Sequence, residues 1–270
     1  MTTESPELDT SPENEVKMTI WEHLGELRSR VTRAAIATFV GTMACWAYKV
    51  QLLALLTKPY EKQWKLQFPK TPLELQTLAP MDVFVNYMQL SMVGGVVIGT
   101  PIIFYQLWSF ISPGLYAKEK RYIVPFVFFS TSLFMAGVSF AYFVAFPFFY
   151  HYTLSQLGAV GDQGTILTSR PTMEAYVDFT TRMLLAFGFI FELPIFITFL
   201  AMAGIVTPRQ LVKFSRWAII GAFALGAVVT PGPEISSQIV VSGALIGLYF
   251  VSVVVAFIVA PKKKAESPPA

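Results

Sequence analysis

Charged residues are scarce in this sequence. Only 14% of the 270 residues are Asp, Glu, Lys or Arg, whereas 54% are hydrophobic. An ordinary soluble domain carries about 25% charged residues, and the mean hydropathy here is +0.55. A globule this apolar could not cover its own surface with polar groups. Composition therefore disfavours a cytosolic enzyme, a nucleic-acid-binding domain, a coiled coil and a disordered chain, and it predicts an all-α polytopic membrane protein.

Cysteine and histidine are nearly absent, which excludes several chemistries. Cys45 is the single cysteine, so no disulfide can form within the chain, and its apolar surroundings are typical of a small buried hydrophobe. His23 and His151 are the only histidines, too few for a zinc site with several histidine ligands. The sequence contains no H-E-x-x-H, G-x-S-x-G or G-x-x-x-x-G-K-[ST] motif. We expect no catalysis, no metal site and no cofactor, so any work must draw on a gradient or on another subunit.

Two tails of different composition flank the apolar region. Residues 1–17 are rich in acids, with Ser-Pro pairs, which is typical of a disordered tail. The tail has no basic stretch ahead of an apolar run and does not resemble a cleavable signal peptide. Residues 261–270 begin with Pro-Lys-Lys-Lys and are predicted to form a basic tail. The membrane domain is expected to occupy residues 18–260.

Six apolar runs are long enough, or nearly long enough, to cross a bilayer, which takes about 20 residues. We place six transmembrane helices at about 34–56, 83–111, 123–150, 179–203, 217–230 and 236–259. The fifth has only 14 residues, about 21 Å of helix against a hydrocarbon core of about 30 Å. The last two helices are therefore expected to be short, and a thinned bilayer or a partner protein would cover the mismatch.

The distribution of basic residues predicts the orientation. Six spans put both termini on one side, and 13 of the 20 Lys and Arg residues fall on that side. Because cytoplasmic loops are enriched in Lys and Arg, both termini are expected in the cytoplasm. The first outer loop runs against this rule, because it alone contains four lysines.

Prolines and glycines inside the spans indicate how the helices pack. Each of three prolines removes a backbone donor and bends its helix, which predicts a curved, concave wall. They are Pro101, Pro147 and Pro194. Two pairs of glycines, spaced four residues apart, allow helices to approach closely, and we expect both pairs to serve packing within the chain. They are Gly95 with Gly99 and Gly243 with Gly247.

The segment before the first span, 18–33, has the pattern of an amphipathic helix. Thr19 followed by Glu22 forms a capping box, and apolar residues repeat on one face at helical spacing. We expect this helix to lie along the inner membrane surface and to lead into the first span. Glu26 and Arg30 are spaced to form an i,i+4 ion pair, and a solvated lead-in held by such a pair is the simpler alternative.

Two further acids are candidates for function. Glu119 is the only acid of the loop between the second and third spans, and three basic residues flank it. It is either a functional carboxylate or one merely neutralised by its neighbours. Glu192 is predicted near mid-membrane, where an ionisable group is a functional hypothesis by default. Its alternative is a neutral carboxyl bonded to a carbonyl that Pro194 leaves without a donor.

Five short motifs follow one another along the chain. They are H-L-G-E-L-R-S-R (23–30), Y-Q-L-W-S-F-I-S-P-G-L with E-K-R (105–115 and 119–121), F-A-Y-F with F-P (140–143 and 146–147), F-G with F-E-L-P (187–188 and 191–194), and T-P with S-Q (230–231 and 237–238). In kind and order they resemble the signatures of the TatC family, the core membrane subunit of the twin-arginine protein translocase. The resemblance covers about residues 18–260. One turn departs from the family, which usually has T-P-P-D where this chain has T-P-G-P-E, ending in Glu234.

This resemblance implies a fold and a function. The fold would have six helices in a concave, glove-like arrangement with both ends in the cytoplasm. The protein would bind twin-arginine signal peptides of folded proteins. With the single-span partners TatA and TatB it would export them across the bacterial inner membrane, using the proton-motive force. It would self-associate in the complex, contact membrane lipid and bind no nucleic acid. A proton-coupled small-solute transporter, with Glu192 as proton carrier, is the alternative.

The resemblance also implies a recognition surface. Glu26 and Glu119 would each bind one arginine of the signal, since a carboxylate pairs bidentately with a guanidinium. Bases around them would repel other cationic peptides, and apolar side chains would contact the hydrophobic region of the signal. These neighbours are Arg28, Arg121, Phe110 and Leu115.

A second set of residues is expected to serve partner binding or transport. It comprises Glu192 within the membrane, and Gln238 and Glu234 near the last outer turn. The fifth and sixth spans are the expected docking surface for the single-span partners. Small residues that allow close approach lie on this pair, at Ala222, Gly226, Gly243 and Gly247.

Overall fold

The computed structural model describes residues 20–111, 123–160, 165–167, 170–229 and 235–259. Its helices are α1 (Ile20–Ala47), α2 (Lys49–Gln67), α3 (Asp82–Ile111), α4 (Ile123–Phe140), the π-helical η3 (Ala141–Ala145), α5 (Phe146–Ser155), α6 (Met173–Ile190), α7 (Leu193–Met202), α8 (Pro208–Val229) and α9 (Ile235–Val259). A short antiparallel hairpin of β1 (Gly158–Val160) and β2 (Thr165–Leu167) is an addition to the all-α expectation.

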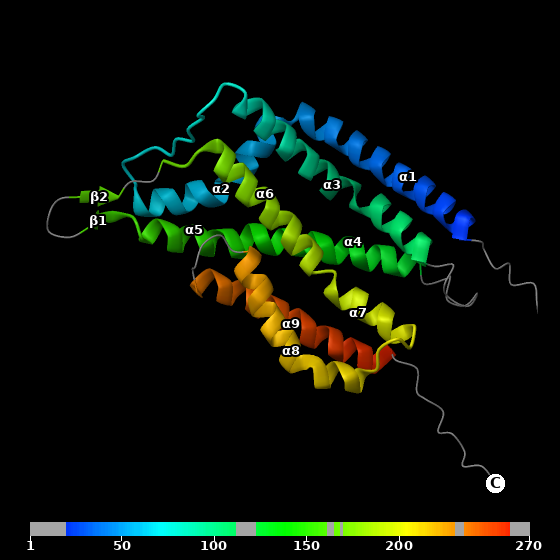
Figure 1. Cartoon of the computed structure of the whole chain (residues 1–270). Helices are drawn as coiled ribbons and strands as arrows, with labels where there is room; N and C mark the ends of the chain where they lie inside the picture. Colours follow the sequence, from blue (N-terminus) through cyan, green and yellow to red (C-terminus); the bar gives the residue numbers. More distant parts are fainter. Residues whose placement is uncertain (1–19, 112–122, 161–164, 168–169, 230–234, 260–270) are drawn as a thin grey trace, which may run out of the picture.

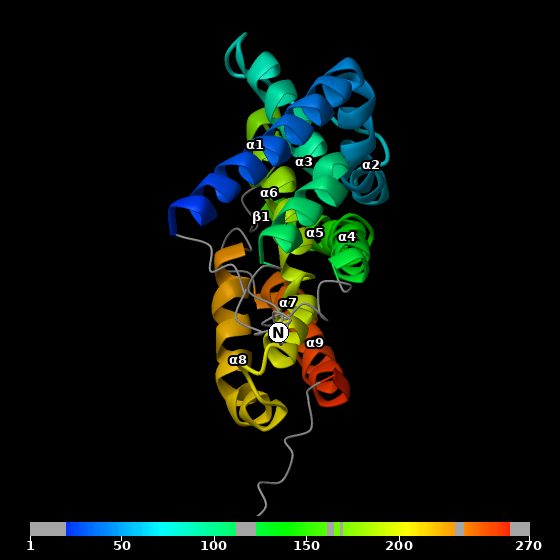
Figure 2. The same cartoon turned by 90° about the vertical axis from the view of Figure 1, so that its right-hand side faces the viewer.

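The helices form one row, in the order α1, α3, α4 with α6, α7, α9 and α8 (Figure 1). In the view of Figure 2, α1 and α8 project to one side while α4 and α5 lie on the other, so the row is curved, as expected. The β1–β2 hairpin lies at one end of the molecule, which we call the hairpin end. The opposite end, where α1 begins and α9 ends, we call the terminal end. In the described segments, five helical segments are long and apolar enough to cross a membrane, or six if the bent pair α1–α2 counts as one span.

The first span differs from its prediction. α1 continues without a break from Ile20 to Ala47, and α2 follows at an angle of 83°. The segment 18–33 is therefore no separate surface helix, because its described part is the first half of α1. The predicted span 34–56 is likewise wrong, because it crosses the bend.

The bend at Tyr48 has a tertiary cause. No proline or glycine lies beside it, and the Tyr48 amide simply donates to the Cys45 carbonyl at 3.0 Å. Beyond the bend, α2 buries Tyr60 and Trp64. Tyr60 packs on Tyr150 of α5 at a ring-centroid distance of 4.7 Å and on Tyr176 of α6 at 5.5 Å. A straight helix could not make these contacts, so packing overrides local continuity.

Glycines bring α1 and α3 together. A Cβ added at Gly95 would lie 2.5 Å from the Thr42 amide and 2.8 Å from the Thr38 carbonyl. One added at Gly41 would meet the Gly95 carbonyl at 2.8 Å. Gly99 also faces Thr38. The expected packing role of the Gly95 and Gly99 pair is therefore confirmed.

Two prolines mark interruptions, as expected. Pro147 follows η3, where the amide of Phe146 bonds back five residues to the carbonyl of Ala141. A π-turn of this kind commonly accommodates a local strain in a helix. Pro194 lies in the first turn of α7, directly after the break that separates α6 from α7.

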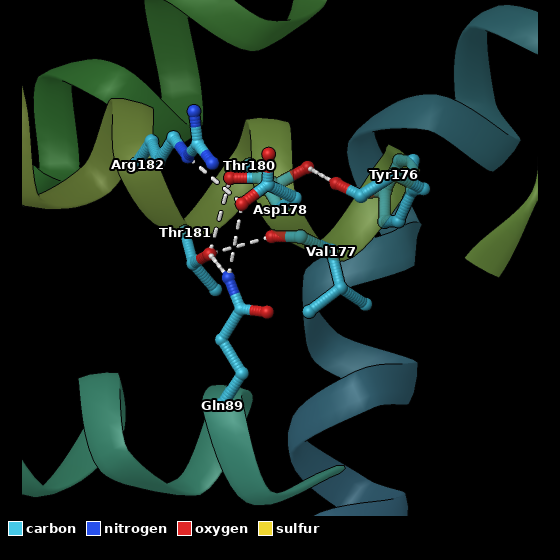
Figure 3. A network of polar contacts seen from close by, with 7 residues as sticks. All are labelled: Gln89, Tyr176, Val177, Asp178, Thr180, Thr181 and Arg182. Carbon is cyan, nitrogen blue, oxygen red and sulfur yellow. Dashed lines mark hydrogen bonds and ion pairs between the residues drawn. The ribbon is translucent and has the colours of Figure 1, made fainter. Parts of the chain in front are cut away.

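A polar network joins α3 to α6 towards the hairpin end (Figure 3). The Gln89 amide donates to Thr181 Oγ1 at 3.1 Å and to Asp178 Oδ1 at 3.3 Å. Asp178 is paired with Arg182 at 2.8 Å. On the other face of α6, the Tyr176 hydroxyl donates to the Leu56 carbonyl of α2 at 2.7 Å and so holds the bent-back helix.

The fifth span begins earlier than predicted. α8 has 22 residues, about 33 Å of helix. It starts at a capping box. The Thr207 hydroxyl accepts from the Gln210 backbone N–H at 3.4 Å, and the Gln210 side-chain oxygen accepts from the Thr207 backbone N–H at 2.8 Å. The basic residues of its first turns do not end the helix, because long basic side chains can reach the interface. α8 and α9 are shorter than the other spans, yet α8 is long enough to cross, so the predicted span 217–230 and its mismatch are wrong.

The α8–α9 hairpin uses only some of its small residues internally. Ser242 donates to the Ala222 carbonyl at 3.2 Å, and a Cβ added at Gly226 would collide with the Ser242 hydroxyl. Among the described residues, Gly243 and Gly247 instead have nothing within 4 Å of an added Cβ. The expectation that this second glycine pair serves packing within the chain is therefore wrong.

Candidate functional site

The start of α1 lies against the end of α3 at the terminal end of the molecule. The His23 ring stacks on the Phe110 ring with centroids 4.5 Å apart and an angle of 18° between the planes. Glu26 lies one turn further along the same face of α1. The stack therefore places Phe110 and Glu26 in one neighbourhood, although 84 positions separate them in the sequence.

Glu26 has one engaged and one unengaged oxygen. Its Oε1 accepts from Arg30 Nε at 2.9 Å, and the Arg30 Nη2 donates to the same atom. Its Oε2 is buried and, among the described residues, has no hydrogen-bond partner. A buried acceptor without a partner costs about 1–3 kcal/mol, so a bound donor at Oε2 would be favourable. The predicted i,i+4 pair is confirmed, and among the described residues it leaves Oε2 without a donor.

The polar and apolar faces of α1 are placed opposite to those of a soluble helix. Glu26 and Arg30 side chains are only 22% and 20% exposed. Leu24, Leu27 and Val31 of the apolar stripe are exposed. Because lipid solvates apolar side chains, a spanning helix shows this arrangement. Arg28 is exposed.

Several predicted site residues lie outside the described residues. They are Glu119, Leu115 and Arg121 of the loop after α3, and Glu234 of the turn before α9. Of the predicted recognition surface, the structure therefore describes Glu26, Arg28 and Phe110, and it brings Glu26 and Phe110 together.

A second polar cluster lies inside the wall, around the break between α6 and α7. Glu192 is the N-cap residue of α7, half-buried, and its Oε1 is buried without a partner among the described residues. The polar groups near its carboxyl are the Ser130 side chain and the Phe134 backbone of α4. Ser130 Oγ in turn accepts from the Trp108 indole nitrogen of α3 at 2.9 Å. Trp108, Ser130 and Glu192 thus form a chain of polar contacts across three helical segments.

The residues around this cluster explain its position. A Cβ added at Gly137 would lie 2.9 Å from the Phe191 Cβ, and a Cβ added at Gly188 would lie 2.6 Å from the Phe134 ring. These contacts press α4 against α6 and bring Ser130 to the level of Glu192. Sequence reasoning missed Ser130 as a partner, because a single serine in an apolar run gives no local signal of its contacts.

Gln238 of α9 has a role within the α8–α9 hairpin. Its amide donates to the Phe223 carbonyl of α8 at 3.0 Å. Gln238 is predicted to bind a partner helix, but this bond already uses one donor of its side-chain amide within the chain. Among the described residues, no group of three or more His, Cys, Asp or Glu side chains could hold a metal ion.

Fold and site together define a polytopic helical membrane protein. One carboxylate, Glu26, lies near the end where α1 packs on α3, and another, Glu192, lies within the wall of helices. A family model described as Sec-independent protein translocase protein (TatC) matches residues 22–243. The chain is 37% identical over 257 residues to the TatC protein of Desulforapulum autotrophicum, and the alignment covers 93% of this chain and 89% of that protein. The identity to the TatC of Helicobacter pylori strain J99 is 35%, with 90% of each chain covered.

Solved structures agree with these sequence matches. A crystal structure described as the twin arginine translocase receptor TatC superposes with a TM-score of 0.73 at 32% identity, covering 88% of this chain and 99% of that one. A second, in the detergent DDM, gives 0.74 at 33% identity, with 87% and 99% covered. The chain belongs to the TatC family, which confirms the resemblance drawn from the five motifs. It is a component of a Sec-independent protein translocase, a protein-transport machine and not an enzyme.

Proposed function

We propose that this protein is the core subunit that binds twin-arginine signal peptides of folded proteins and, with TatA- and TatB-type partners, exports them using the proton-motive force. The observation that carries the proposal is the Glu26 carboxylate. It lies beside the His23–Phe110 stack and keeps a buried oxygen without a partner among the described residues.

Recognition would use charge and shape together. A guanidinium could take Glu26 Oε2 and compete with Arg30 for Oε1, and charge-assisted pairs of this kind are about twice as strong as neutral hydrogen bonds. Glu119 would take the second arginine. Phe110 and Leu115 would contact the apolar region of the signal, while Arg28 and Arg121 would disfavour other cationic peptides.

Glu192 is proposed to act in assembly or transport rather than in recognition. It lies on the α6–α7 break, far along the chain from Glu26, and has one oxygen without a partner in the part of the chain described. A carboxyl inside a membrane protein is costly unless it faces a cavity or a partner. A polar side chain of a partner helix, or of a passenger in transit, would satisfy it.

The orientation and location follow from charge and family. α1 begins and α9 ends at the same end of the molecule (Figure 1), and the basic residues favour that end as the cytoplasmic one. We therefore place the terminal end in the cytoplasm and the hairpin end outside, in a bacterial inner membrane. The subunit would self-associate within the complex.

The surface proposed for the single-span partners is narrower than the sequence suggested. The mismatch of α8 no longer supports docking, and Ala222 and Gly226 are used inside the hairpin. Gly243 and Gly247 remain open on α9. Small residues four positions apart on an open helix face allow another helix to approach closely, so this face is the proposed contact for a TatA- or TatB-type helix.

A photoreactive signal peptide tests the proposal directly. The purified protein in detergent would be irradiated with a twin-arginine peptide and, separately, with its twin-lysine analogue. We expect crosslinks to the region of Glu26 with the first peptide and far fewer with the second, because lysine cannot pair bidentately. Equal crosslinking of both peptides would overturn the assignment. Transport of a small solute by the protein alone in liposomes would favour the transporter instead.

A further inference from the structure

The bent-back helix α2 and the segment after it enclose a groove. The segment 69–75, which we call the strap, folds back along α2 and leaves a groove of about 710 Å³ between them. Ligand sites of proteins have volumes of about 300–1,000 Å³. None of the residues that line this groove belongs to the recognition surface or to the Glu192 cluster.

The groove is preformed, because both ends of the strap are anchored. The Trp64 indole nitrogen donates to the Thr71 carbonyl at 2.8 Å. Beyond the strap, two backbone hydrogen bonds follow. The Gln76 backbone N–H donates to the Pro171 carbonyl at 3.0 Å, and the Met173 backbone N–H donates to the Gln76 backbone carbonyl at 2.7 Å. The strap is thus tied to α2 at one point and to the start of α6 at another. A ligand would not need to order this wall on binding.

The depth of the groove can be read from an aromatic layer. Tyr60 of α2 contacts Tyr150 and Tyr176, which lie close to the hairpin ends of their spans, Ile123–Ser155 and Met173–Met202. These three tyrosines are buried in the core, and because the two spans end within a few residues of Tyr150 and Tyr176, the Tyr60 layer lies at the hairpin end of the spans. From the bend, α2 runs towards that end (Figure 1), and the groove extends along it on both sides of Tyr60.

The chemistry of the lining changes at that layer. Val50, Leu53 and Ala54 line the part nearer the bend, on the membrane side of Tyr60. Lys65 and Lys70 line the part beyond it, on the water side. The ligand that matches this order has an apolar tail within the bilayer and an anionic head at the interface.

Charge supports an anionic head in spite of one acid in the lining. α2 and the strap contain five lysines and two glutamates. The acid in the groove, Glu61, is paired with Lys65 at 2.6 Å, and an ammonium has three donors, so Lys65 can still bind another anion. Lys70 has no ion-pair partner among the residues that the structure describes. This arrangement also accounts for outer lysines that run against the positive-inside rule.

We propose that the groove between α2 and the strap binds an anionic phospholipid of the leaflet at the hairpin end, with its phosphate at Lys65 and Lys70 and an acyl chain along Val50, Leu53 and Ala54. The lipid would fasten the bent-back helix to the bilayer. This inference is independent of signal-peptide binding.

Retention of added lipid by the purified protein tests this site. The protein in mild detergent would be mixed with phosphatidylglycerol or with phosphatidylcholine of the same acyl chains, and bound lipid would be counted by native mass spectrometry. The wild type should retain phosphatidylglycerol preferentially. A basic residue near a membrane surface contributes about fivefold to the binding of an anionic lipid, so Lys65→Gln with Lys70→Gln should lower its retention at least fivefold.

The chain offers a matched control. Lys58→Gln with Lys62→Gln removes the same charge from α2, outside the groove lining, and should change retention less than twofold. Leu53→Trp should lower retention of both lipids, because the larger side chain fills the apolar part of the groove. If Leu53→Trp does not fold, Ala54→Leu serves as the filling variant. Equal retention of the two lipids by the wild type, or equal losses in the two lysine pairs, would overturn the site. So would a photoreactive residue at Ala54 that crosslinks in membranes to polypeptide and not to lipid.

Discussion

The His23 ring, in the first turn of α1, stacks on the Phe110 ring, in the last turn of α3, at a centroid distance of 4.5 Å. The stack lies at the terminal end of the α1–α3 pair, in which the Gly41 and Gly95 backbones pack closely. Glu26 lies one turn further along α1 and is 22% exposed, whereas the residues of the apolar stripe are exposed. The carboxylate proposed for recognition thus lies on a helix that packs closely on α3, and its position does not depend on a loop.

Replacing Glu26 should weaken binding of a twin-arginine peptide. Glu26→Gln keeps the size of the side chain but removes the charge that a guanidinium pairs with, and hydrogen bonds to charged groups are worth about 1.5–3 kcal/mol. We expect affinity to fall about tenfold or more, measured by fluorescence anisotropy with a labelled signal peptide. Glu74→Gln, on the exposed strap, is the matched control and should leave affinity unchanged. A Glu26→Gln protein that still binds as the wild type does would contradict the role.

Replacing Glu192 should separate transport from recognition. In Glu192→Ala the Ser130 and Trp108 pair loses the carboxyl beside it, while the α1–α3 surface is untouched. Export of a folded reporter should fall severely, and signal-peptide affinity should stay within about twofold of the wild type, less than 0.5 kcal/mol. Glu192→Gln tells whether a hydrogen-bonding side chain is enough. Normal export by the Glu192→Ala variant would contradict a role of Glu192 in transport.

The close packing of α4 on α6 predicts an effect on stability. Gly137→Ala adds a methyl group 2.9 Å from the Phe187 carbonyl carbon and the Phe191 Cβ, and overpacking of this kind costs about 1–3 kcal/mol. Thermal unfolding in detergent, followed by circular dichroism, should show a lower midpoint. Gly243→Ala introduces the same methyl group where nothing lies within 4 Å and should cause no loss. Equal midpoints in the two variants would show that α4 and α6 can move apart at no cost.

The open glycine face of α9 predicts where single-span partners touch. In a background carrying Cys45→Ala, a cysteine at Gly243 or Gly247 should form disulfide crosslinks in membranes with a cysteine in a TatA- or TatB-type helix. A cysteine at Leu245, which is only 2% exposed, should not. Crosslinks that instead cluster on α1 to α4 would mean that the partners dock elsewhere.

Some features followed from the sequence because their causes are local. Hydrophobic length sets which segments can span, so α3 and α9 coincide with the runs 83–111 and 236–259 to within one residue at each end. A proline acts on its own helix: a π-helical segment lies beside Pro147 and a break lies beside Pro194, whereas α3 continues through Pro101. The Glu26–Arg30 pair needs only helical spacing. The Thr207–Gln210 capping box that starts α8 is equally local, and it sets the start of α8 ahead of the basic residues Arg209, Lys213 and Arg216.

Other features depended on partners far away in the chain. The bend at Tyr48 exists because Tyr60 and Trp64 gain more by packing on α5 and α6 than α1 gains by continuing. Ser130 reaches Glu192 only because glycines let α4 and α6 meet. Identical glycine spacings end in opposite environments, since Gly95 is covered by α1, while no atom of the described residues lies within 4 Å of a Cβ added at Gly243. Spacing and hydrophobicity determined that helices form and roughly where. Which faces they bury, and so which polar groups meet, was decided by long-range packing that no local pattern encodes.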